Sequence, residues 1–477
     1  MKVQGIDIDK ALTQVRQQLE QEKDLSPGLR ASIEMLLTLF VVLINRLGIN
    51  SRNSSKPPSS DPNRPKQKRS RSKRPSGGQP GHVGKTLEPV EDPDDISVIK
   101  IDRRRLPRGE YVEAGFESRQ VFDIDIRRWV TEYRAQVLEN AAGERFVAEF
   151  PQGVERKVQY GDGIKAHAVY LSQYQLLPYK RIQEYFADQL GIALSDGSLV
   201  NFNRQAHVQL ETFEGISKTA LAKAMSAHAD ETGVNIDGKR HWLHCATNRQ
   251  WTHYQVHAKR GKEAMDEIGI LPRFRGVLCH DHWKPYYRYQ DCTHALCNAH
   301  HLRELERAAE QDDQQWAVAM GSLLKEINRA VEGAGGVLPP VRAGGYRRRY
   351  RNLLKQADKE CPAPEQPPDK KTRGRLKRSK ARNLLERLTA YEDDVLRFMI
   401  HANVPFTNNQ AENDVRMTKV QQKISGCFRS EEGARMFCRI RGYLSTCRKH
   451  GMSASEALRL AFEGKLPDFA LERDGAE

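Results

Sequence analysis

The stretch MSAHADETGV, residues 225–234, decides the fold that we expect, because it places an acid inside a run that alternates like a buried strand. Successive side chains of a strand point to opposite faces of a sheet. His228 and Asp230 therefore share one face, and Ala229 and Glu231 share the other. An acid in such a strand is a candidate catalytic residue. The alternative is a strand that ends in an Asp-rich turn without function.

Neighbouring runs predict the rest of a sheet. The segments HWLHCATN (241–248) and WTHYQVHA (251–258) have strand character, and an Asp-Gly turn leads into them. Together with the first stretch they predict a three-strand meander. A fourth run, GVLCHDHW (276–283), contains a second acid, Asp281, at its end. We expect Asp281 to share the sheet with Asp230.

The third acid is expected on a helix. In NNQAENDVRMTKV (408–420), one of the two leading asparagines can cap a helix that carries Glu412, Arg416 and Lys419 along one side. Asp414 is a competing candidate, and spacing alone leaves this choice open. A Glu in the first turn of a helix is also favoured by the helix dipole without any function.

Three carboxylates in one site suit phosphoryl transfer. Carboxylate oxygens are hard ligands for Mg²⁺, and three of them carry enough negative charge to hold two ions. Two ions roughly 3.5 to 4 Å apart stabilise the attacking and the leaving oxygens of an in-line displacement at a phosphodiester. We expect Asp230, Asp281 and Glu412 to be catalytic and to bind two Mg²⁺, which Mn²⁺ could replace. Water or a DNA 3′-hydroxyl would be the nucleophile.

Composition indicates a multidomain protein with a polyanionic partner. The chain has 477 residues, and its 77 Lys and Arg outnumber its 62 Asp and Glu. Nucleic acid is the first partner to expect for such a balance. The 8 cysteines have no framework spacing, which indicates reduced thiols. No signal-peptide core is present, and the longest apolar run (35–44) is too short to span a bilayer. We expect a cytoplasmic, nucleoid-associated protein without a membrane segment.

The N-terminal segments predict self-association and DNA contact. Apolar residues from Leu29 to Leu47 alternate steps of four and three, which is typical of a coiled coil or of an amphipathic helix packed on its own domain. A Pro- and Ser-rich basic segment follows, which predicts a flexible linker. Its cations are expected to contact the DNA backbone without sequence preference. They are Arg64, Lys66, Lys68, Arg69, Arg71, Lys73 and Arg74.

The middle of the chain carries weaker signals. Alternating runs predict a small antiparallel β unit before two amphipathic helices, which Gly191 and a Ser195 cap separate. These helices fit a helix-turn-helix that places residues 198–205 in a major groove, and an ordinary helical hairpin fits equally. Two further cationic runs, 346–351 and 367–382, form a second candidate DNA surface.

Zinc is not expected. A site could be built from Cys and His after the second acid, but the spacing matches no common zinc finger. The candidate ligands are Cys292, His294, Cys297 and His300.

Four motifs, spread over nearly the whole chain, occur in the same order as in a known family. They are SSKPPSSD (54–61), GGQPGHVGKTL (77–87), ADETG (229–233) and NNQAENDVRMTKVQQKISGCFRSEEGA (408–434). In these motifs the chain resembles transposases of the insertion sequence sixty-six family. The first and last are long enough that chance matches are improbable.

The resemblance implies a DDE transposase with a ribonuclease H-like core. It makes Asp230 the first acid and Asp281 the second, and it favours Glu412 over Asp414 as the third. The sequence Cys-Asn-Ala-His that begins at Cys297 is similar to an element that several DDE groups carry after the second acid. It implies structural support near the site from Cys297 and His300.

The chain departs from the family pattern at two places. Residues 103–115 contain no cysteine where relatives commonly have a CxxC zinc motif, so an N-terminal zinc knuckle is not expected. Asn413 stands where an arginine usually follows the last Ala-Glu pair, and Arg416 could replace it.

The resulting prediction is a multidomain α/β transposase that binds terminal inverted repeats and joins them to target DNA. A dimer or larger homo-oligomer and accessory proteins of the same element are its expected partners. Two alternatives stay open, a regulatory DNA-binding protein derived from a transposase and a ribonuclease H-like nuclease without strand transfer. The expected divisions are a helical segment (1–50), basic linker (51–83), β domain (84–155), DNA-binding helices (156–222), catalytic core (223–310 and 403–460), helical insertion (311–402) and tail (461–477).

Overall fold

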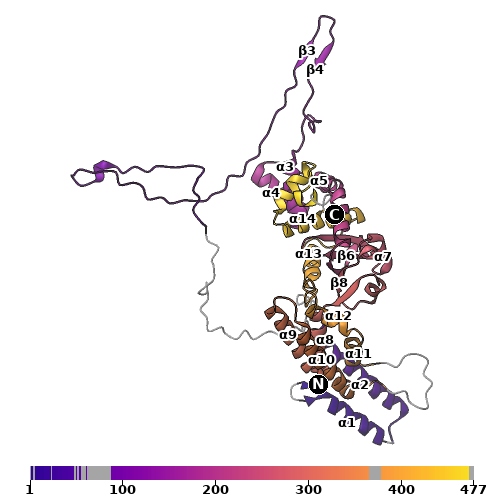
Figure 1. Ribbon diagram of the computed structural model, residues 1–477. Coiled ribbons are helices and arrows are strands. Elements are labelled where there is room, and N and C mark those ends of the chain that lie inside the picture. The colour runs from indigo at the N-terminus through magenta and orange to yellow at the C-terminus, as the bar shows by residue number, and fades with distance from the viewer. Residues whose placement is uncertain are drawn as a thin grey trace.

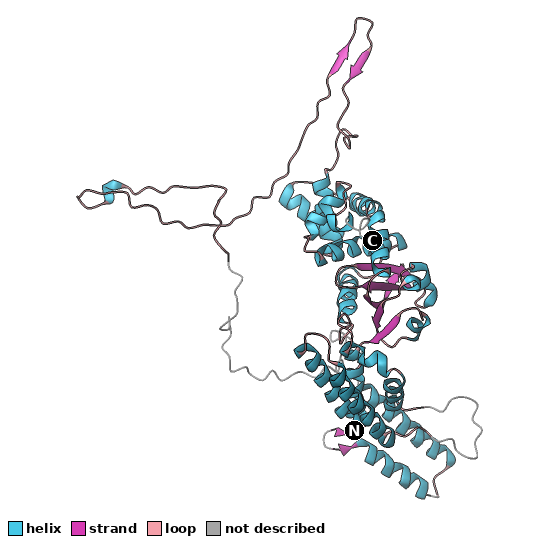
Figure 2. Ribbon diagram, in the orientation of Figure 1, coloured by secondary structure: helices cyan, strands magenta, loops and turns pink. Residues whose placement is uncertain are grey.

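The computed structural model describes residues 2–3, 6–22, 24–47, 50, 53–54, 61, 87–364 and 378–471. A central sheet lies between two helical bodies, and two extended segments project from the upper body (Figure 1; Figure 2). The basic linker falls outside the described residues, so its DNA contacts stay a prediction. This applies to Arg64, Lys66, Lys68, Arg69, Arg71, Lys73 and Arg74.

The central sheet has five strands in the order β7-β6-β5-β8-β9. Its strands are β5 (Ser226–Ile236), β6 (Lys239–Thr247), β7 (Thr252–His257), β8 (Val277–His280) and β9 (Thr293–Leu296). The first three along the chain are antiparallel neighbours, as predicted, and β5, β8 and β9 are parallel. Asp237 and Gly238 both have positive φ in the turn between β5 and β6, which matches the twist of a tight hairpin. The chain is therefore a mixed α/β protein.

Helices cover both faces of the sheet. The helices α13 (Asn409–Ser425) and α14 (Glu431–Lys449) cover one face, where Val234 of β5 shares a core with Val415 and Phe437. The short helix α7 (Lys262–Ile268) and the 3₁₀ turn Lys284–Arg288 lie on the other face, where Ala229 packs with Met265. Because side chains alternate along β5, some of its residues pack in the core with α13 and α14 and others in the core with α7.

The upper helical body joins two distant parts of the chain. Its helices are α3 (Asp162–Val169), the π-helical turn Tyr170–Tyr174, α4 (Tyr179–Leu190), α5 (Asp196–Gln209), α6 (Glu211–Ala222), α15 (Ala454–Phe462) and α16 (Asp468–Leu471). They share one apolar core with α14. Ser195 caps α5 as predicted, because its Oγ accepts the N–H of Ser198 at 3.0 Å.

The described part of the expected C-terminal tail, residues 461–471, packs against the upper body. Phe469 of α16 stacks on His450 with ring centroids 3.9 Å apart, and Ala470 is buried. The described end of the chain therefore belongs to the upper body, because its apolar residues complete that body's core.

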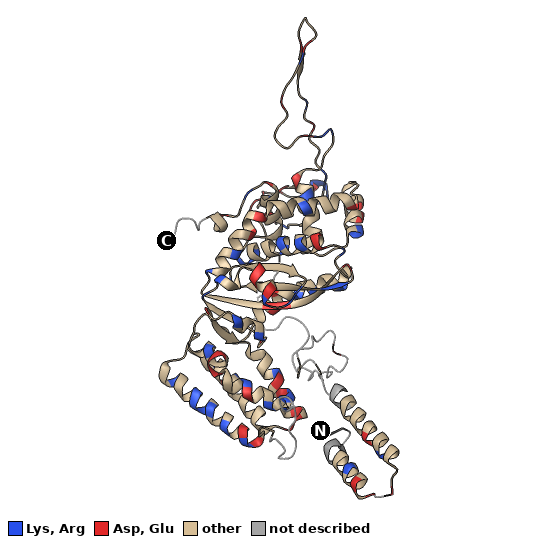
Figure 3. Cartoon of the chain, turned by 90° about the vertical axis from the view of Figure 1, so that its right-hand side faces the viewer, with Lys and Arg blue, Asp and Glu red and all other residues tan. Residues whose placement is uncertain are grey.

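The lower helical body is the predicted insertion together with the helix that precedes it. It contains α8 (Asn298–Gln311), α9 (Gln315–Gly333), α10 (Pro340–Glu360), α11 (Lys380–Ala390) and α12 (Glu392–Leu396). Several arginines of the first cationic run pair with acids of the same body. Arg349 bonds Glu326, and Arg351 bonds Glu392. Figure 3 shows acidic positions beside basic ones along these helices, and these ion pairs compensate part of the charge that was expected to face DNA.

The N-terminal helices α1 (Ile8–Gln21) and α2 (Pro27–Leu47) follow two short strands, β1 (Lys2–Val3) and β2 (Ile6–Asp7). The heptad residues Leu36, Phe40 and Leu43 are half or more exposed. The coiled coil thus stays a prediction. No helix in the described part of the chain is long and apolar enough to cross a membrane.

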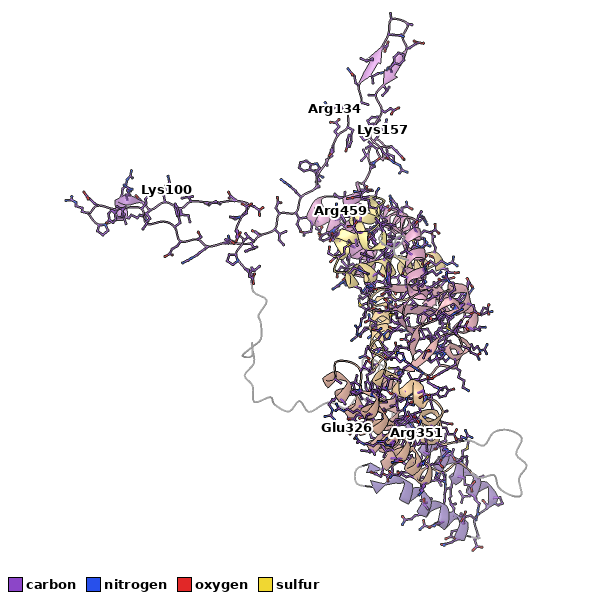
Figure 4. All side chains as sticks on the ribbon, in the orientation of Figure 1. Lys100, Arg134, Lys157, Glu326, Arg351 and Arg459 are labelled. Atoms are coloured by element: carbon purple, nitrogen blue, oxygen red, sulfur yellow. The ribbon has the colours of Figure 1, made fainter. Side chains whose placement is uncertain are left out.

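The predicted small β unit is largely wrong. Within residues 87–155 the strands are only β3 (Val137–Glu139) and β4 (Arg145–Val147), and the rest is extended chain apart from the 3₁₀ turn Arg103–Arg105. Arg134 and Lys157 lie on the projecting hairpin in Figure 4. The alternating pattern does not form a sheet because its apolar side chains have no core to pack against; Trp129 is 81% exposed.

Candidate active site

Asp230 lies on β5, and Asp281 directly follows the neighbouring parallel strand β8. The register of β5 and β8 pairs His228 with Cys279, and each acid stands two residues beyond this pair. Two residues further along a strand the side chains return to the same face. Asp230 Oδ1 accepts the N–H of Glu231 at 2.9 Å, and Asp281 Oδ1 accepts the N–H of Trp283 at 2.9 Å. Local backbone groups therefore hold both carboxylates.

Asn408 anchors the start of α13 to β5. It occupies the N-cap position, but its side chain does not cap the helix, contrary to expectation. Its amide oxygen accepts from His228 Nδ1 at 2.7 Å, and its Nδ2 donates to Ala229 O at 2.9 Å. Its backbone N–H donates to Cys297 Sγ at 3.0 Å. Glu412 lies one helical turn later, so these bonds fix Glu412 beside the strand that carries Asp230.

Asp230 interacts electrostatically with both distant acids. Its pKa is raised to about 8, first by burial and then by the charges of Glu231, Asp281 and Glu412. Both distant acids thus lie close enough to repel the Asp230 carboxylate. The strand register sets Asp281 near Asp230, and Glu412 on α13 is near enough to influence the Asp230 carboxylate.

The site suits a hard divalent cation. The charges of Asp281 and Glu412 both act on Asp230, and Glu412 Oε1 is buried without a hydrogen-bond partner, although the oxygens of these three acids do not all lie within 4.8 Å of one another. Oxygen donors of this kind are the ligands that Mg²⁺ and Mn²⁺ prefer. A bound cation would offset the repulsion that raises the pKa of Asp230. The residues present therefore fit the expected ions.

Asp414 is engaged in a different network. Its Oδ2 accepts from Thr247 Oγ1 at 2.7 Å and from Lys449 Nζ at 3.0 Å. The Asp414 and Lys449 side chains are only 15% and 12% exposed. Because its carboxylate already has a buried cation partner, Asp414 is poorly suited to be the third metal ligand. The geometry favours Glu412.

The four candidate zinc ligands of the sequence do not form one cluster. His294 Nδ1 lies 3.0 Å from His280 Nε2, and Cys292 Sγ lies 4.0 Å from the other nitrogen of His294. Cys297 and His300 instead approach Glu412, and the ligand atoms of these three residues lie within 4.8 Å of one another.

A cation–π stack beside the acids was not foreseen. Glu231, with 2% of its side chain exposed, accepts from Arg260 Nε at 2.8 Å and from Tyr286 Oη at 2.5 Å. The Arg260 guanidinium lies 4.7 Å from the ring centroid of Trp242 and 4.3 Å from that of Trp283. The position of Glu231 next to Asp230 in the sequence could have indicated that Glu231 lies near the site. No spacing in the sequence pairs Glu231 with Arg260.

The two basic residues predicted on α13 have different surroundings. Lys419 Nζ donates to Gly233 O at 2.7 Å, and burial followed by the charge of Arg240 lowers the pKa of Lys419. Arg416 is exposed. Arg303 of α8, which the sequence did not point to, approaches Glu412 Oε2 at 3.6 Å.

We expect Asn408→Ala to weaken both stability and activity. The change leaves His228 Nδ1 and Ala229 O without partners, so the free energy of unfolding should fall by roughly 2 to 4 kcal/mol. Metal-dependent DNA cleavage should fall roughly 10- to 100-fold, as for other residues that orient a metal ligand. Urea unfolding and a nicking assay measure the two effects. Asn409→Ala is the control, because Asn409 is exposed; an equal loss in both variants would contradict the anchoring role.

Comparison with known proteins gives three matches. The transposase IS66 family matches residues 157–436, which is more than half of the chain and includes β5, β8 and α13. A family of unknown function matches residues 2–88. The uncharacterized protein y4jO of Sinorhizobium fredii (strain NBRC 101917 / NGR234) is 26% identical over 177 residues, which cover 36% of this chain and 50% of that protein. The chain thus spans about half the length of this curated relative. From the family match, the chain belongs to the IS66 family of transposases.

Proposed function

We propose that the chain is a DDE transposase that cuts and joins DNA with a ribonuclease H-like core. One observation supports this proposal above the others. Asp230 lies on a central strand, Asp281 directly follows its parallel neighbour and Glu412 lies on a covering helix, and the charges of Asp281 and Glu412 both act on Asp230. The sheet order β7-β6-β5-β8-β9, with three antiparallel strands followed by two parallel ones, supports the core. Membership of a transposase family supports the activity.

Each acid has a role in this proposal. Asp230, Asp281 and Glu412 would hold two Mg²⁺, and the bound metal would supply stabilisation of the negative charge that develops at a phosphodiester. The bonds of Asn408 keep Glu412 in place, and on the other face of β5 the buried Glu231 is paired with the partly exposed Arg260. Water would serve as nucleophile in releasing a 3′-hydroxyl, and that hydroxyl would then attack target DNA.

The proposed substrate is double-stranded DNA, namely the terminal inverted repeats of an insertion sequence and its target. The net charge of +15 supports a polyanionic partner. Exposed Arg416 is suited to contact phosphates near the acids, since it follows Glu412 on α13 by one turn. Synapsis of two ends requires at least a dimer, and accessory proteins of the element are further proposed partners.

A strand-transfer assay with pre-cut ends tests this function. The full chain is incubated with terminal-repeat DNA that already carries a free 3′-hydroxyl, with a target plasmid and with Mg²⁺. We expect covalent joining of the ends to the plasmid. A nuclease without strand transfer would nick the DNA but join nothing, and a regulatory binding protein would shift the DNA in a gel without any cleavage; either result contradicts the proposal.

A further inference from the structure

We propose that Cys297, His300 and Glu412 form a binding site for a thiophilic divalent cation of the zinc class, next to the magnesium ligands. The three residues come from the N-terminal end of α8 and the first turn of α13. Their ligand atoms lie within 4.8 Å of one another, and they are the one such group of His, Cys and acidic residues within the described ranges. The mixture of sulfur, imidazole nitrogen and carboxylate oxygen differs from the three carboxylates that suit Mg²⁺.

Two of the ligand atoms lack hydrogen-bond partners. His300 Nδ1 and Glu412 Oε1 are both buried without such a partner, and they face each other at 3.7 Å. Buried polar atoms are nearly always hydrogen-bonded, so a pair of unsatisfied atoms that converge needs an explanation. A cation between them satisfies both at once.

The geometry is close to that of a zinc site. With Zn–S near 2.3 Å and Zn–N near 2.0 Å, tetrahedral ligand atoms stand roughly 3.3 to 3.6 Å apart. The His300 and Glu412 atoms already lie 3.7 Å apart, and the ligand atoms of all three residues lie within 4.8 Å of one another, so small shifts would complete the site. The side chains of His300 and Glu412 are 25% and 31% exposed, which leaves room for a water as fourth ligand and for access of the ion.

Surrounding groups orient the ligands. The backbone N–H of Asn408 donates to Cys297 Sγ at 3.0 Å, a contact that helps to hold a thiolate. Arg303 approaches the other carboxylate oxygen of Glu412 at 3.6 Å, which leaves Oε1 for the ion. On binding, the Cys297 thiol would release its proton to solvent, and the resulting thiolate and the Glu412 carboxylate would balance the charge of a divalent ion.

This site also offers a means of regulation, a consequence that rests on the proposed function. Glu412 is shared with the magnesium ligands, so a zinc-class ion would withdraw it from them. Zn²⁺ should therefore inhibit cleavage in the presence of Mg²⁺, and the inhibition relative to each variant's own zinc-free rate should be weaker in Cys297→Ser.

Cobalt absorption tests the site without any DNA cleavage, so its failure is distinct from failure of the transposase proposal. Co²⁺ added to the full chain should give a sulfur-to-cobalt charge-transfer band that Zn²⁺ abolishes and excess Mg²⁺ does not. Cys297→Ser should lose the band. His300→Gln should lower Zn²⁺ affinity roughly tenfold or more while circular dichroism stays unchanged. Cys427→Ser is the matched control, since Cys427 is exposed and could bind cobalt by itself.

Three outcomes would overturn the proposal. One is the absence of a charge-transfer band from the wild-type chain. Another is a band that Cys427→Ser removes and Cys297→Ser retains. If Cys297→Ser fails to fold, His300→Gln alone decides, and unchanged Zn²⁺ affinity in that variant counts against the site.

Discussion

Asp230→Asn should abolish metal-dependent DNA cleavage while leaving binding of terminal-repeat DNA intact. The variant keeps the size of the side chain and its place on β5, but it removes a negative ligand from the centre of the acid cluster. Loss of several kcal/mol of charge stabilisation in the transition state corresponds to a fall in rate of roughly 10³-fold or more. Nicking and gel-shift assays on the same preparation measure both properties. Asp237→Asn, at an exposed turn of the same sheet, is the matched control.

The same variant should be more stable than the wild type when no metal is bound. Burial, with neighbouring carboxylates, raises the pKa of Asp230 from 3.8 to about 8. The folded state therefore keeps a proton that the unfolded state releases, and stability contributed by this group is lost as the pH rises between these values. In Asp230→Asn the side chain at this position does not titrate, so it adds no pH dependence to the stability.

Urea unfolding in the presence of a chelator measures how much more stable Asp230→Asn is than the wild type. This difference in the free energy of unfolding should be absent below pH 4, grow as the pH rises and level off above pH 8. There it reaches on the order of 1 to 3 kcal/mol, after allowance for partial solvent exposure. Added Mg²⁺ should stabilise the wild type more than the variant. An Asp230→Asn variant that is less stable than wild type at pH 8 would argue against a crowded cluster of carboxylates.

Asp414→Ala should be severely destabilising, whereas Glu412→Gln should not. Removing Asp414 leaves the Lys449 ammonium without its counter-ion between α14 and β6, where the two side chains are 15% and 12% exposed. Breaking a buried ion pair by removing one partner costs about 3 to 5 kcal/mol. Glu412→Gln instead keeps the size of the side chain, and Glu412 Oε1 has no hydrogen bond to lose, so the variant should reduce cleavage with little loss of stability.

The different effects of these two variants would distinguish Asp414, which we assign a structural role, from Glu412, which we assign a catalytic role. Chemical unfolding and nicking rates of both variants, measured side by side, test it. If Glu412→Gln unfolds the protein and Asp414→Ala only lowers the nicking rate, the roles that we assign to these two residues are reversed.

The sheet could be predicted because alternation and turn residues are local. The stretch around Asp230 and the two strands that follow it form the antiparallel meander that the pattern indicates. The sequence predicted that Asp281 and Asp230 share a sheet. It did not predict that β5 and β8 are parallel neighbours, which is what sets Asp281 beside Asp230. β9 was missed, because the short strand Thr293–Leu296 lies among residues that were interpreted as candidate metal ligands.

Other features depend on contacts that no local pattern contains. The choice between Glu412 and Asp414 follows from Lys449 and Thr247, which are distant in sequence. The alternating runs of residues 87–155 satisfy the pattern of a strand but have no opposing core, so only β3 and β4 form. Either Asn408 or Asn409 was expected to cap the helix. Asn408 occupies the N-cap position, but its side chain bonds instead to buried groups of β5, which need partners.

Anomalous diffraction from crystals of the full chain soaked with Mn²⁺ tests the central claim most directly. We predict two Mn²⁺ peaks, roughly 3.5 to 4 Å apart, between the carboxylates of Asp230, Asp281 and Glu412. Crystals in which Mn²⁺ binds elsewhere, with no peak within about 2.6 Å of an oxygen of Asp230, would contradict the account.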